Sequence, residues 1–329
     1  MTSHGRLAGV IPPLCTPLTP EGRVDEPSLD RLVDHLIEGG VHGLFVLGTT
    51  GEVSALTDAQ REQVVVAAVA RAGGRLPVLA GAIDTGTERV VDQARRAAAA
   101  GADAVVVTAP FYAATHHEEI RRHFAEVAAR VDVPVVAYDI PSKVGTKLSP
   151  DTVIELAAEG AIVAVKDSSG SDVSLRALLS RRSARGLDLS VFTGSELTVD
   201  YAIGLGCDGV VPGLGNVDPA GYRRLFDLAS AGQVELARAE QDRLFELFGI
   251  TSVASRAGRS ATSAALGAFK AALVEFGVIA GATLARPGIP LDEAERAGVR
   301  ALIAEFGPRI GERVGAGTIG SGSEEPVGQ

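Results

Sequence analysis

Short runs of apolar residues alternate along most of the chain with segments whose apolar residues recur every three or four positions. The first pattern is typical of buried strands and the second of amphipathic helices. Glycine, proline or a helix-capping residue separates most neighbouring segments. The pattern predicts strands at 9–14, 43–47, 76–80, 103–108, 133–138, 161–166, 189–193 and 208–212, and helices at 29–37, 57–72, 87–100, 118–130 and after a capping pair at 149–150.

Several of these units repeat one another. The segments Gly40–Val46, Gly101–Val107 and Gly206–Val211 each place a helix-ending glycine before a buried strand. Leu76–Ala80 and Val133–Ala137 form a second matching pair. Eight such units in succession predict a parallel (β/α)8 TIM barrel with its helices outside. An open doubly wound sheet is the alternative, but no G-x-G-x-x-G sequence opens a helix after a strand.

The alternation ends after Pro219. Helical patterns without a clear strand follow at 235–248, 263–276 and 291–306. The end of the chain is rich in glycine, serine and glutamate, a composition typical of a disordered tail. The predicted organisation is a barrel at 1–231, a C-terminal helical region at 232–310 and a disordered tail at 311–329.

Composition narrows the possible classes of protein. The 329 residues are 46% hydrophobic, which suffices for a large core, and single α/β barrels often reach this length. The formal net charge of −10 argues against a nucleic-acid partner, because phosphate binding needs a basic face. Cys15 and Cys207 form neither a disulfide framework nor a metal-ligand spacing, which indicates a reducing compartment. No membrane-spanning run and no signal-peptide pattern occur, so we expect a cytoplasmic protein without membrane partners.

The apolar run from Ala161 to Val165 leads directly into Lys166. Burial disfavours the charged form of an ammonium group, and a lysine made neutral in this way is a nucleophile that forms a Schiff base with a carbonyl. Only four of the 31 lysines and arginines are lysine, and arginine cannot form an imine. These features indicate Lys166 as a candidate nucleophile. The ordinary alternative is a strand-end lysine that points to water.

Polar side chains follow other strands at the end where barrel enzymes hold their active sites. Thr49 and Thr50 lie in a turn between glycines, where hydroxyl and backbone N–H groups suit a carboxylate. Tyr138 ends the strand before that of Lys166, and a tyrosine beside an amine nucleophile is a suitable proton shuttle. The other strand-end candidates are Tyr112, Ser195 and Glu196.

Longer motifs surround these residues, in the order Gly9–Pro12 with Thr16–Pro17, Gly48–Glu52, Pro110–Tyr112, Tyr138–Gly145 and Val165–Asp167. By these motifs, over about residues 7–310, the chain resembles the dihydrodipicolinate synthase / N-acetylneuraminate lyase family of class I aldolases. The resemblance implies a barrel with a C-terminal helical region. It also implies a homotetramer built as a dimer of dimers, small-molecule substrates, no cofactor and no metal.

The resemblance further implies a role for each catalytic residue. Lys166 would form an imine with the keto carbon of pyruvate or a related 2-oxo acid, and Tyr138 would move protons to and from the bound substrate. Thr49 would link Tyr138 to Tyr112, which reaches into the site of the neighbouring subunit. The enamine formed beside the imine would attack an aldehyde or be released by cleavage of a carbon–carbon bond.

The resemblance also assigns the binding residues, some of which depart from the family pattern. Thr50 and the N–H groups of its turn would hold the pyruvate carboxylate, and the carbonyl of Val211 would lie near the imine. Lys143 stands where synthases usually have an arginine for the aldehyde's carboxylate, and lysine keeps the charge but loses the bidentate fork. Glu196 could accept hydrogen bonds from substrate hydroxyls, as in sugar-acid aldolases of the family, and Asp139 replaces a more usual asparagine. A dihydrodipicolinate-synthase-like reaction and a 2-keto-3-deoxy sugar-acid aldolase or dehydratase therefore both stay open.

Two other classes of function are alternatives. A metal-dependent aldolase needs clustered histidine and carboxylate ligands. The only close group is His116, His117 and His123, at a helix start where a solvated face is the ordinary role. A non-catalytic 2-oxo-acid-binding protein on the same barrel is the second alternative. Retention of Lys166 together with both tyrosines and both threonines argues against it.

Overall fold

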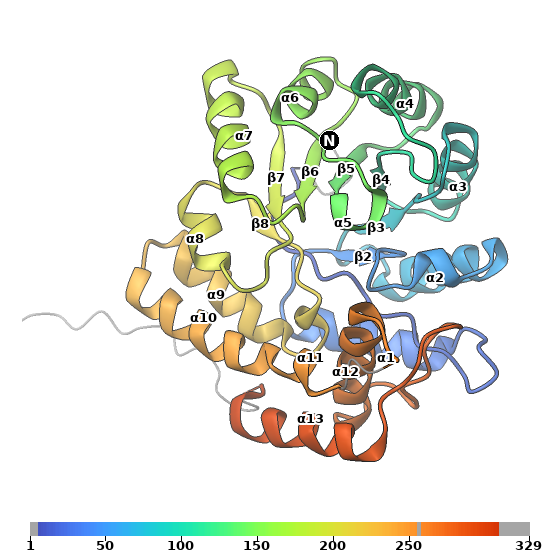
Figure 1. Cartoon of the computed structure of the whole chain (residues 1–329), viewed down its shortest axis with the longest axis vertical. Coiled ribbons are helices and arrows are strands. Elements are labelled where there is room, and N and C mark those ends of the chain that lie inside the picture. The colour runs from blue at the N-terminus through green and yellow to red at the C-terminus, as the bar shows by residue number, and fades with distance from the viewer. Residues whose placement is uncertain (1–5, 255–257, 309–329) are drawn as a thin grey trace, which may run out of the picture.

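The predicted strands form one parallel sheet in the computed structural model, which describes residues 6–254 and 258–308 (Figure 1). The strands follow one another in the order β1-β8-β7-β6-β5-β4-β3-β2. From β2 to β8 each strand lies beside its neighbours in sequence, and β1 lies beside β8, as in a barrel. The strands are β1 (Gly9–Val10), β2 (Leu44–Val46), β3 (Val78–Gly81), β4 (Ala104–Thr108), β5 (Val135–Asp139), β6 (Ala164–Asp167), β7 (Ser190–Thr193) and β8 (Gly209–Val210).

The barrel closes just beyond β1, against β2. Pro13 forms a parallel bridge with Phe45, and the N–H of Leu14 donates to the carbonyl of Phe45 at 2.8 Å. On the other side of β1, a Cβ at Gly209 would lie 2.1 Å from the carbonyl oxygen of Gly9, so β8 needs glycine at this close approach. These contacts confirm the predicted TIM barrel.

Helices with clear start residues cover the outside of the barrel (Figure 1). Thr57 accepts from the N–H of Gln60, whose side chain accepts from the N–H of Thr57, so the predicted capping box of α2 is confirmed. Ser149 accepts from the N–H of Thr152 at the start of α6, as its capping pair predicts. The helices of the barrel are α1 (Glu26–Glu38), α2 (Asp58–Ala72), α3 (Thr87–Ala99), α4 (His117–Arg130), α5 (Pro141–Val144), α6 (Pro150–Ala158), α7 (Asp172–Arg185), α8 (Val199–Gly204) and α9 (Pro219–Ser230), with 3₁₀ turns at Val53–Ala55 and Leu214–Asn216.

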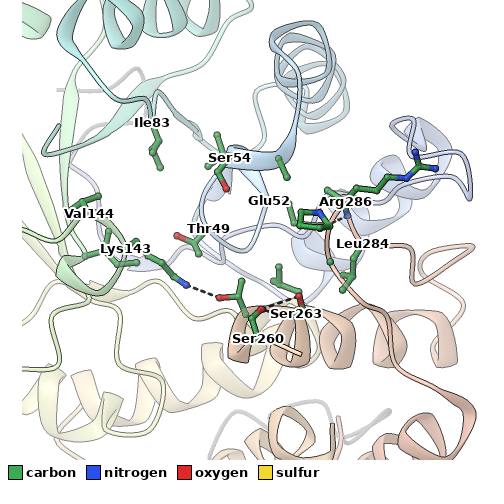
Figure 2. Close-up of a pocket in the computed structure, with 18 of the residues that line it drawn as sticks. Thr49, Glu52, Ser54, Ile83, Lys143, Val144, Ser260, Ser263, Leu284 and Arg286 are labelled. Atoms are coloured by element: carbon green, nitrogen blue, oxygen red, sulfur yellow. Dashed lines mark hydrogen bonds between the residues drawn. The ribbon is translucent and has the colours of Figure 1, made fainter. Parts of the chain in front are cut away.

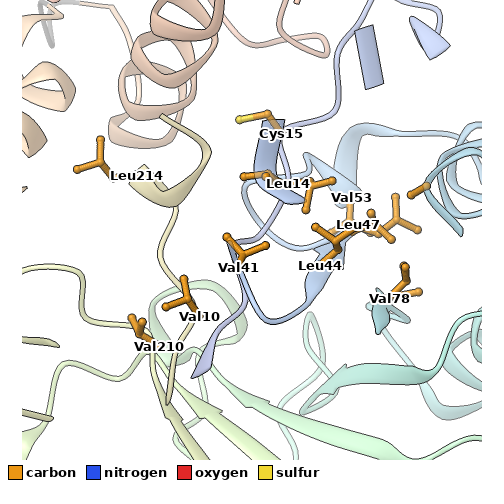
Figure 3. Close-up of a cluster of buried hydrophobic side chains, with 14 of the residues drawn as sticks. Val10, Leu14, Cys15, Val41, Leu44, Leu47, Val53, Val78, Val210 and Leu214 are labelled. Carbon is orange, nitrogen blue, oxygen red and sulfur yellow. The ribbon is translucent and has the colours of Figure 1, made fainter. Parts of the chain in front are cut away.

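Strand side chains alternate between two apolar layers. In β4, Ala104 and Val106 join the cluster that fills the barrel interior, whereas Val105 and Val107 join the larger cluster between strands and helices. Figure 3 shows part of this outer layer near β1, β2 and β8. Tyr138 belongs to the inner cluster, so the packed interior supports the strand ends at which the site residues lie.

The C-terminal helical region packs beside α8 and α9, as Figure 1 shows in orange and red. No strand occurs in residues 232–254 and 258–308, in agreement with the prediction. None of the helices in the described part of the chain is long and apolar enough to cross a membrane. The predicted tail at 311–329 lies outside the described residues. The helices of this region are α10 (Val234–Phe248), α11 (Ile250–Val253), α12 (Ala261–Glu275) and α13 (Glu293–Phe306).

The structure differs from the prediction at some element boundaries. β1 ends at Val10 rather than at residue 14, because Pro12 and Pro13 have no N–H to donate to the ladder. The prediction gave no bounds for α5, α7, α8 or α9. In α5, four residues are too few to show a helical period. These differences leave the order of the elements unchanged.

Candidate active site

A cavity of about 510 Å³ opens at the carboxyl ends of the strands, between the barrel and the C-terminal helical region. Thr49, Ile83 and Tyr138 line it from the barrel side, and Ser260 and Leu284 from the other. Figure 2 shows Thr49 and Ser260 on opposite sides of this space. The carboxyl end of the strands is where barrel enzymes carry out their chemistry, so this cavity is the candidate active site.

Lys166 and Tyr138 lie side by side at the ends of β6 and β5. The parallel register pairs them directly, and Lys166 Nζ lies 4.2 Å from the centroid of the Tyr138 ring. The ring of Phe45 lies 5.3 Å from the same nitrogen. Lys166 is 6% exposed and Tyr138 3% exposed. The lysine therefore does not point to water, and the structure brings the predicted nucleophile and proton shuttle together.

Thr49 connects this pair to the cavity. Its Oγ1 lies 3.4 Å from the hydroxyl of Tyr138. Burial raises the pKa of Tyr138, but the charge of Lys166 and hydrogen bonds with Thr49, Lys166 and Ser168 outweigh burial, so the pKa lies below its usual value. A phenol with a lowered pKa gives up its proton more readily near neutral pH, which suits a proton shuttle.

Backbone strain gathers in the loops that carry the candidate residues. Leu47 and Glu52, on either side of the turn at 48–51, both have φ of 58°, and Tyr112 has φ of 79°. Among the described residues, these are the only non-glycine positions with positive φ. Gly81 of β3 makes room for this turn, since a Cβ there would lie 2.0 Å from the carbonyl oxygen of Leu47. Such strain persists where a functional geometry requires it, which supports a functional role for these loops.

A buried ion pair fastens the same turn to the C-terminal helical region. Lys270 of α12 is completely buried, and its Nζ donates to Glu52 Oε1. The same nitrogen donates to the carbonyl of Thr283 at 2.7 Å. The other oxygen of Glu52 accepts from the N–H of Ala285 at 2.6 Å. Lys270 is not among the site residues predicted from the sequence. The pattern that could have revealed it is a single lysine within the otherwise apolar helical face at 264–273.

We expect Lys270→Met to lower the free energy of unfolding by about 3–5 kcal/mol, because it leaves the Glu52 carboxylate buried without its cation. Glu52→Gln combined with Lys270→Met should restore most of this loss, since glutamine keeps an acceptor for the N–H of Ala285. Urea unfolding at one protein concentration measures both effects, and Lys143→Met at the exposed rim is the matched control with no more than a small change. Equal losses in the single and double variants would contradict this account.

Lys143 spans the mouth of the cavity. Its Nζ donates to Thr262 Oγ1 at 2.7 Å, which links α5 to the start of α12 (Figure 2). The hydroxyls of Ser260 and Ser263 lie on the same rim, 3.1 Å apart. The rim therefore offers one ammonium and several hydroxyls, a combination that suits an anionic or hydroxylated substrate.

Three other candidates are less closely associated with Lys166 and Tyr138. Thr50 is half-buried in the turn that carries Thr49. Val211 is buried and lines a small interior cavity that Lys166 also lines. Tyr112 is completely exposed, so within one chain it does not contact Thr49. The roles of these three residues stay predictions.

Glu196 bonds to the loop that follows β8. Its Oε1 accepts from the N–H of Leu214 at 2.5 Å, in the 3₁₀ turn after β8, and it does not line the cavity of about 510 Å³. Burial raises the pKa of its carboxyl to about 7, against smaller lowering effects from Leu214 and Lys166. Contact of this carboxylate with substrate hydroxyls stays a prediction.

The three histidines lie around α4. His116 caps the helix by accepting from the N–H of Glu118, and His117 is its first residue. His123 is buried with its Nδ1 3.0 Å from Thr87 Oγ1, and burial lowers its pKa to about 4. In residues 6–254 and 258–308, no group of three or more histidine, cysteine, aspartate or glutamate side chains is placed to hold a metal ion.

Known proteins resemble this chain over most of its length. The model of the dihydrodipicolinate synthetase family matches residues 6–306. A 4-hydroxy-tetrahydrodipicolinate synthase of Stenotrophomonas maltophilia is 39% identical over 238 residues, which cover 72% of this chain and 79% of that protein. An uncharacterized DapA-like lyase of Halobacterium salinarum is 36% identical over 304 residues, which cover 92% of this chain and 94% of that protein.

Solved structures agree with this result. The Escherichia coli prophage protein YagE, of the dihydrodipicolinic acid synthase family and in complex with pyruvate, has a TM-score of 0.85 at 29% identity, covering 91% of this chain and 98% of its own. Dihydrodipicolinate synthase of Bacteroides thetaiotaomicron has the same TM-score at 31% identity, covering 91% and 98%. The matched barrel, the matched length and the family model lead to one conclusion: the chain belongs to the dihydrodipicolinate synthase family.

Proposed function

We propose that this protein is a Schiff-base-forming lyase or synthase that acts on pyruvate or a related 2-oxo acid. The observation that carries the proposal is the contact between Lys166 Nζ and Tyr138, both buried at the active end of the barrel. Membership of the family and the pyruvate bound to YagE support it.

In the proposed reaction, the neutral amine of Lys166 attacks the keto carbon of the 2-oxo acid. Tyr138 carries one proton from the attacking nitrogen to the former carbonyl oxygen and then supplies a second from its own hydroxyl. The oxygen leaves as water, and the protonated imine and the Tyr138 phenolate remain. This cation withdraws electrons from the neighbouring carbon, so loss of a proton there gives an enamine. The enamine attacks an aldehyde, and hydrolysis of the new imine releases the product and the lysine. Cleavage of a carbon–carbon bond follows the same steps in reverse.

The remaining site residues bind and orient the substrate in this proposal. Thr50 and the N–H groups of its turn hold the carboxylate, and the carbonyl of Val211 lies near the imine. Thr49 holds the Tyr138 hydroxyl, at the observed separation of 3.4 Å. Tyr112 of a second copy completes the proton relay in a homotetramer built as a dimer of dimers. The complete exposure and positive φ of Tyr112 support this assignment.

We also propose a cytoplasmic location. Cys15 and Cys207 are both free and buried, which agrees with a reducing compartment.

The second substrate is either an aldehyde with a carboxylate, as for a synthase, or a hydroxylated aldehyde, as for a sugar-acid aldolase. Lys143 bonds to Thr262 on a rim that carries several hydroxyl groups. This rim supports a hydroxylated aldehyde as a candidate substrate. If the aldehyde carries a carboxylate, Lys143→Met should raise its KM about 10- to 100-fold through loss of a charge-assisted hydrogen bond. Steady-state assays with a carboxylated aldehyde and with glyceraldehyde measure the difference. An unchanged KM for both would contradict a binding role for Lys143.

Proton exchange tests the proposed function without knowledge of the aldehyde. In deuterium oxide, the enzyme should exchange the methyl protons of pyruvate for deuterium, because the enamine forms and reverts. The loss of the methyl signal in proton NMR measures the rate. Folded wild-type protein that catalyses no exchange, with pyruvate or with longer 2-oxo acids, would contradict the proposal.

A further inference from the structure

Two buried carboxylates lie directly behind the candidate catalytic pair. Asp139 follows Tyr138 and Asp167 follows Lys166, and the register of β5 and β6 places the two aspartates opposite each other. They are 2% and 7% exposed. Because side chains alternate along a strand, the aspartates lie on the face away from the barrel interior. Like charges directly opposite each other on neighbouring strands repel, so this arrangement needs compensation.

Lys147, in the loop between α5 and α6, provides that compensation. Its Nζ donates to Asp139 Oδ2 and lies 3.9 Å from Asp167 Oδ2. The outer oxygens also have donors: the N–H of Leu148 lies 3.0 Å from Asp139 Oδ1, and the N–H of Ser169 lies 2.8 Å from Asp167 Oδ1. Each carboxylate oxygen therefore faces a hydrogen-bond donor or the ammonium.

This group lies where the two strands end. The last ladder pair is Asp139 with Asp167, and one further backbone bond joins the strands, from the N–H of Ser168 to the carbonyl of Asp139 at 2.8 Å. A neutral asparagine at 139 would carry no charge and would leave Lys147 with Asp167 alone. The aspartate therefore makes Lys147 the shared cation of two strand ends in this chain.

We propose that Lys147, Asp139 and Asp167, here called the Lys147 cluster, position Tyr138 and Lys166 for imine formation by holding the ends of β5 and β6 together. The inference rests on the proposed function, because it concerns the rate at which Lys166 reacts with pyruvate. The three residues are positioning residues, since they act through their strand neighbours. Without the ammonium, repulsion between the carboxylates would separate the strand ends and change the 4.2 Å spacing of Lys166 and Tyr138.

The contacts of the Lys147 cluster determine how the repulsion between its two carboxylates should change with pH. Burial raises the pKa of Asp139, while Lys147 and the N–H of Leu148 lower it and Asp167 raises it further. Burial raises the pKa of the Cys207 thiol, and the charge of Asp167 raises it further by a smaller effect. Removing the ammonium of Lys147 therefore moves the pKa of Asp139 higher. At low pH the carboxyl is then neutral and the repulsion is relieved, whereas at high pH it ionises and the repulsion returns.

The test compares the rate of pyruvate-imine formation, measured by quenching with borohydride at successive times, in wild type and variants. Lys147→Met should slow imine formation about 10- to 100-fold at alkaline pH, as expected for displaced reacting groups, and much less at acidic pH. The double variant with Asp139→Asn and Lys147→Met should form the imine at a rate within about threefold of wild type. It should lack the added pH dependence, because only one carboxylate remains. Lys147→Arg should retain most of the rate.

Circular dichroism at each pH verifies that the compared proteins are folded, and Lys147→Gln replaces Lys147→Met if the latter does not fold. Lys147→Met with a wild-type rate at every pH would overturn the inference. A loss that is equal at every pH and that Asp139→Asn does not relieve would overturn it as well. Absence of any adduct in wild type would instead contradict the proposed function, so the two failures are distinguishable.

Discussion

Lys166→Met is expected to reduce both pyruvate proton exchange and carbon–carbon bond formation at least about 10³-fold, because no other amine can replace the nucleophile. The three other lysines are held elsewhere. Lys143 bonds to Thr262 on the rim, Lys147 to Asp139 outside the barrel, and Lys270 to Glu52. Borohydride should then trap no adduct on the variant.

The same substitution should leave the fold intact. Lys166 is surrounded by apolar side chains of the barrel interior, among them Val136 and Phe192, so methionine fits without an unpaired polar group. The free energy of unfolding should be equal to or higher than that of wild type, as is common when a buried functional group is removed. Arg122→Met, at a surface ion pair with Glu126, is the control that should change neither activity nor stability. Catalysis by folded Lys166→Met at more than a few per cent of wild type would contradict this prediction.

Tyr138→Phe should reduce proton exchange and overall turnover about 10²- to 10⁴-fold, the range for loss of a general acid–base group. Phenylalanine keeps the aromatic ring beside Lys166 Nζ, so borohydride should still trap the imine, at a slower rate. The ratio of trapped adduct to exchange rate, measured on the same samples, separates imine formation from the proton transfer that follows it. Thr49→Val should show a smaller loss of about 10-fold, because it removes only the hydrogen bond to the Tyr138 hydroxyl.

The pH profile gives a further check on Tyr138. Its lowered pKa means that the phenol loses its proton, and with it the ability to act as an acid, at a pH below the usual value of 10. The wild-type rate should therefore fall on the alkaline side, and Tyr138→Phe should lack this fall. Exchange by Tyr138→Phe at the wild-type rate and with the wild-type profile would assign the proton transfers to another group.

Much of the fold and the centre of the site follow from local patterns in the sequence. The alternation of apolar runs with helical periods predicts the barrel, because most units show their own period. Lys166 and Tyr138 could be placed together because they end neighbouring strands of one parallel sheet, where position in sequence determines position in space.

Contacts between distant segments could not be predicted in the same way. Lys270 and Glu52 are 218 positions apart, and Lys143 and Thr262 are 119 apart, so no local period connects them. Glu196 illustrates a second reason: its place after β7 is clear from the sequence, but the direction of its side chain depends on the N–H of Leu214 in another loop.

Borohydride trapping shows directly whether Lys166 forms an imine with pyruvate. The protein is incubated with pyruvate, reduced with borohydride, digested and mapped by mass spectrometry, with Lys166→Met as the control. We expect one reduced pyruvyl adduct, on the peptide that contains Lys166, and no adduct in the control. An unmodified Lys166 in folded wild-type protein, or an adduct on Lys143 instead, would contradict it.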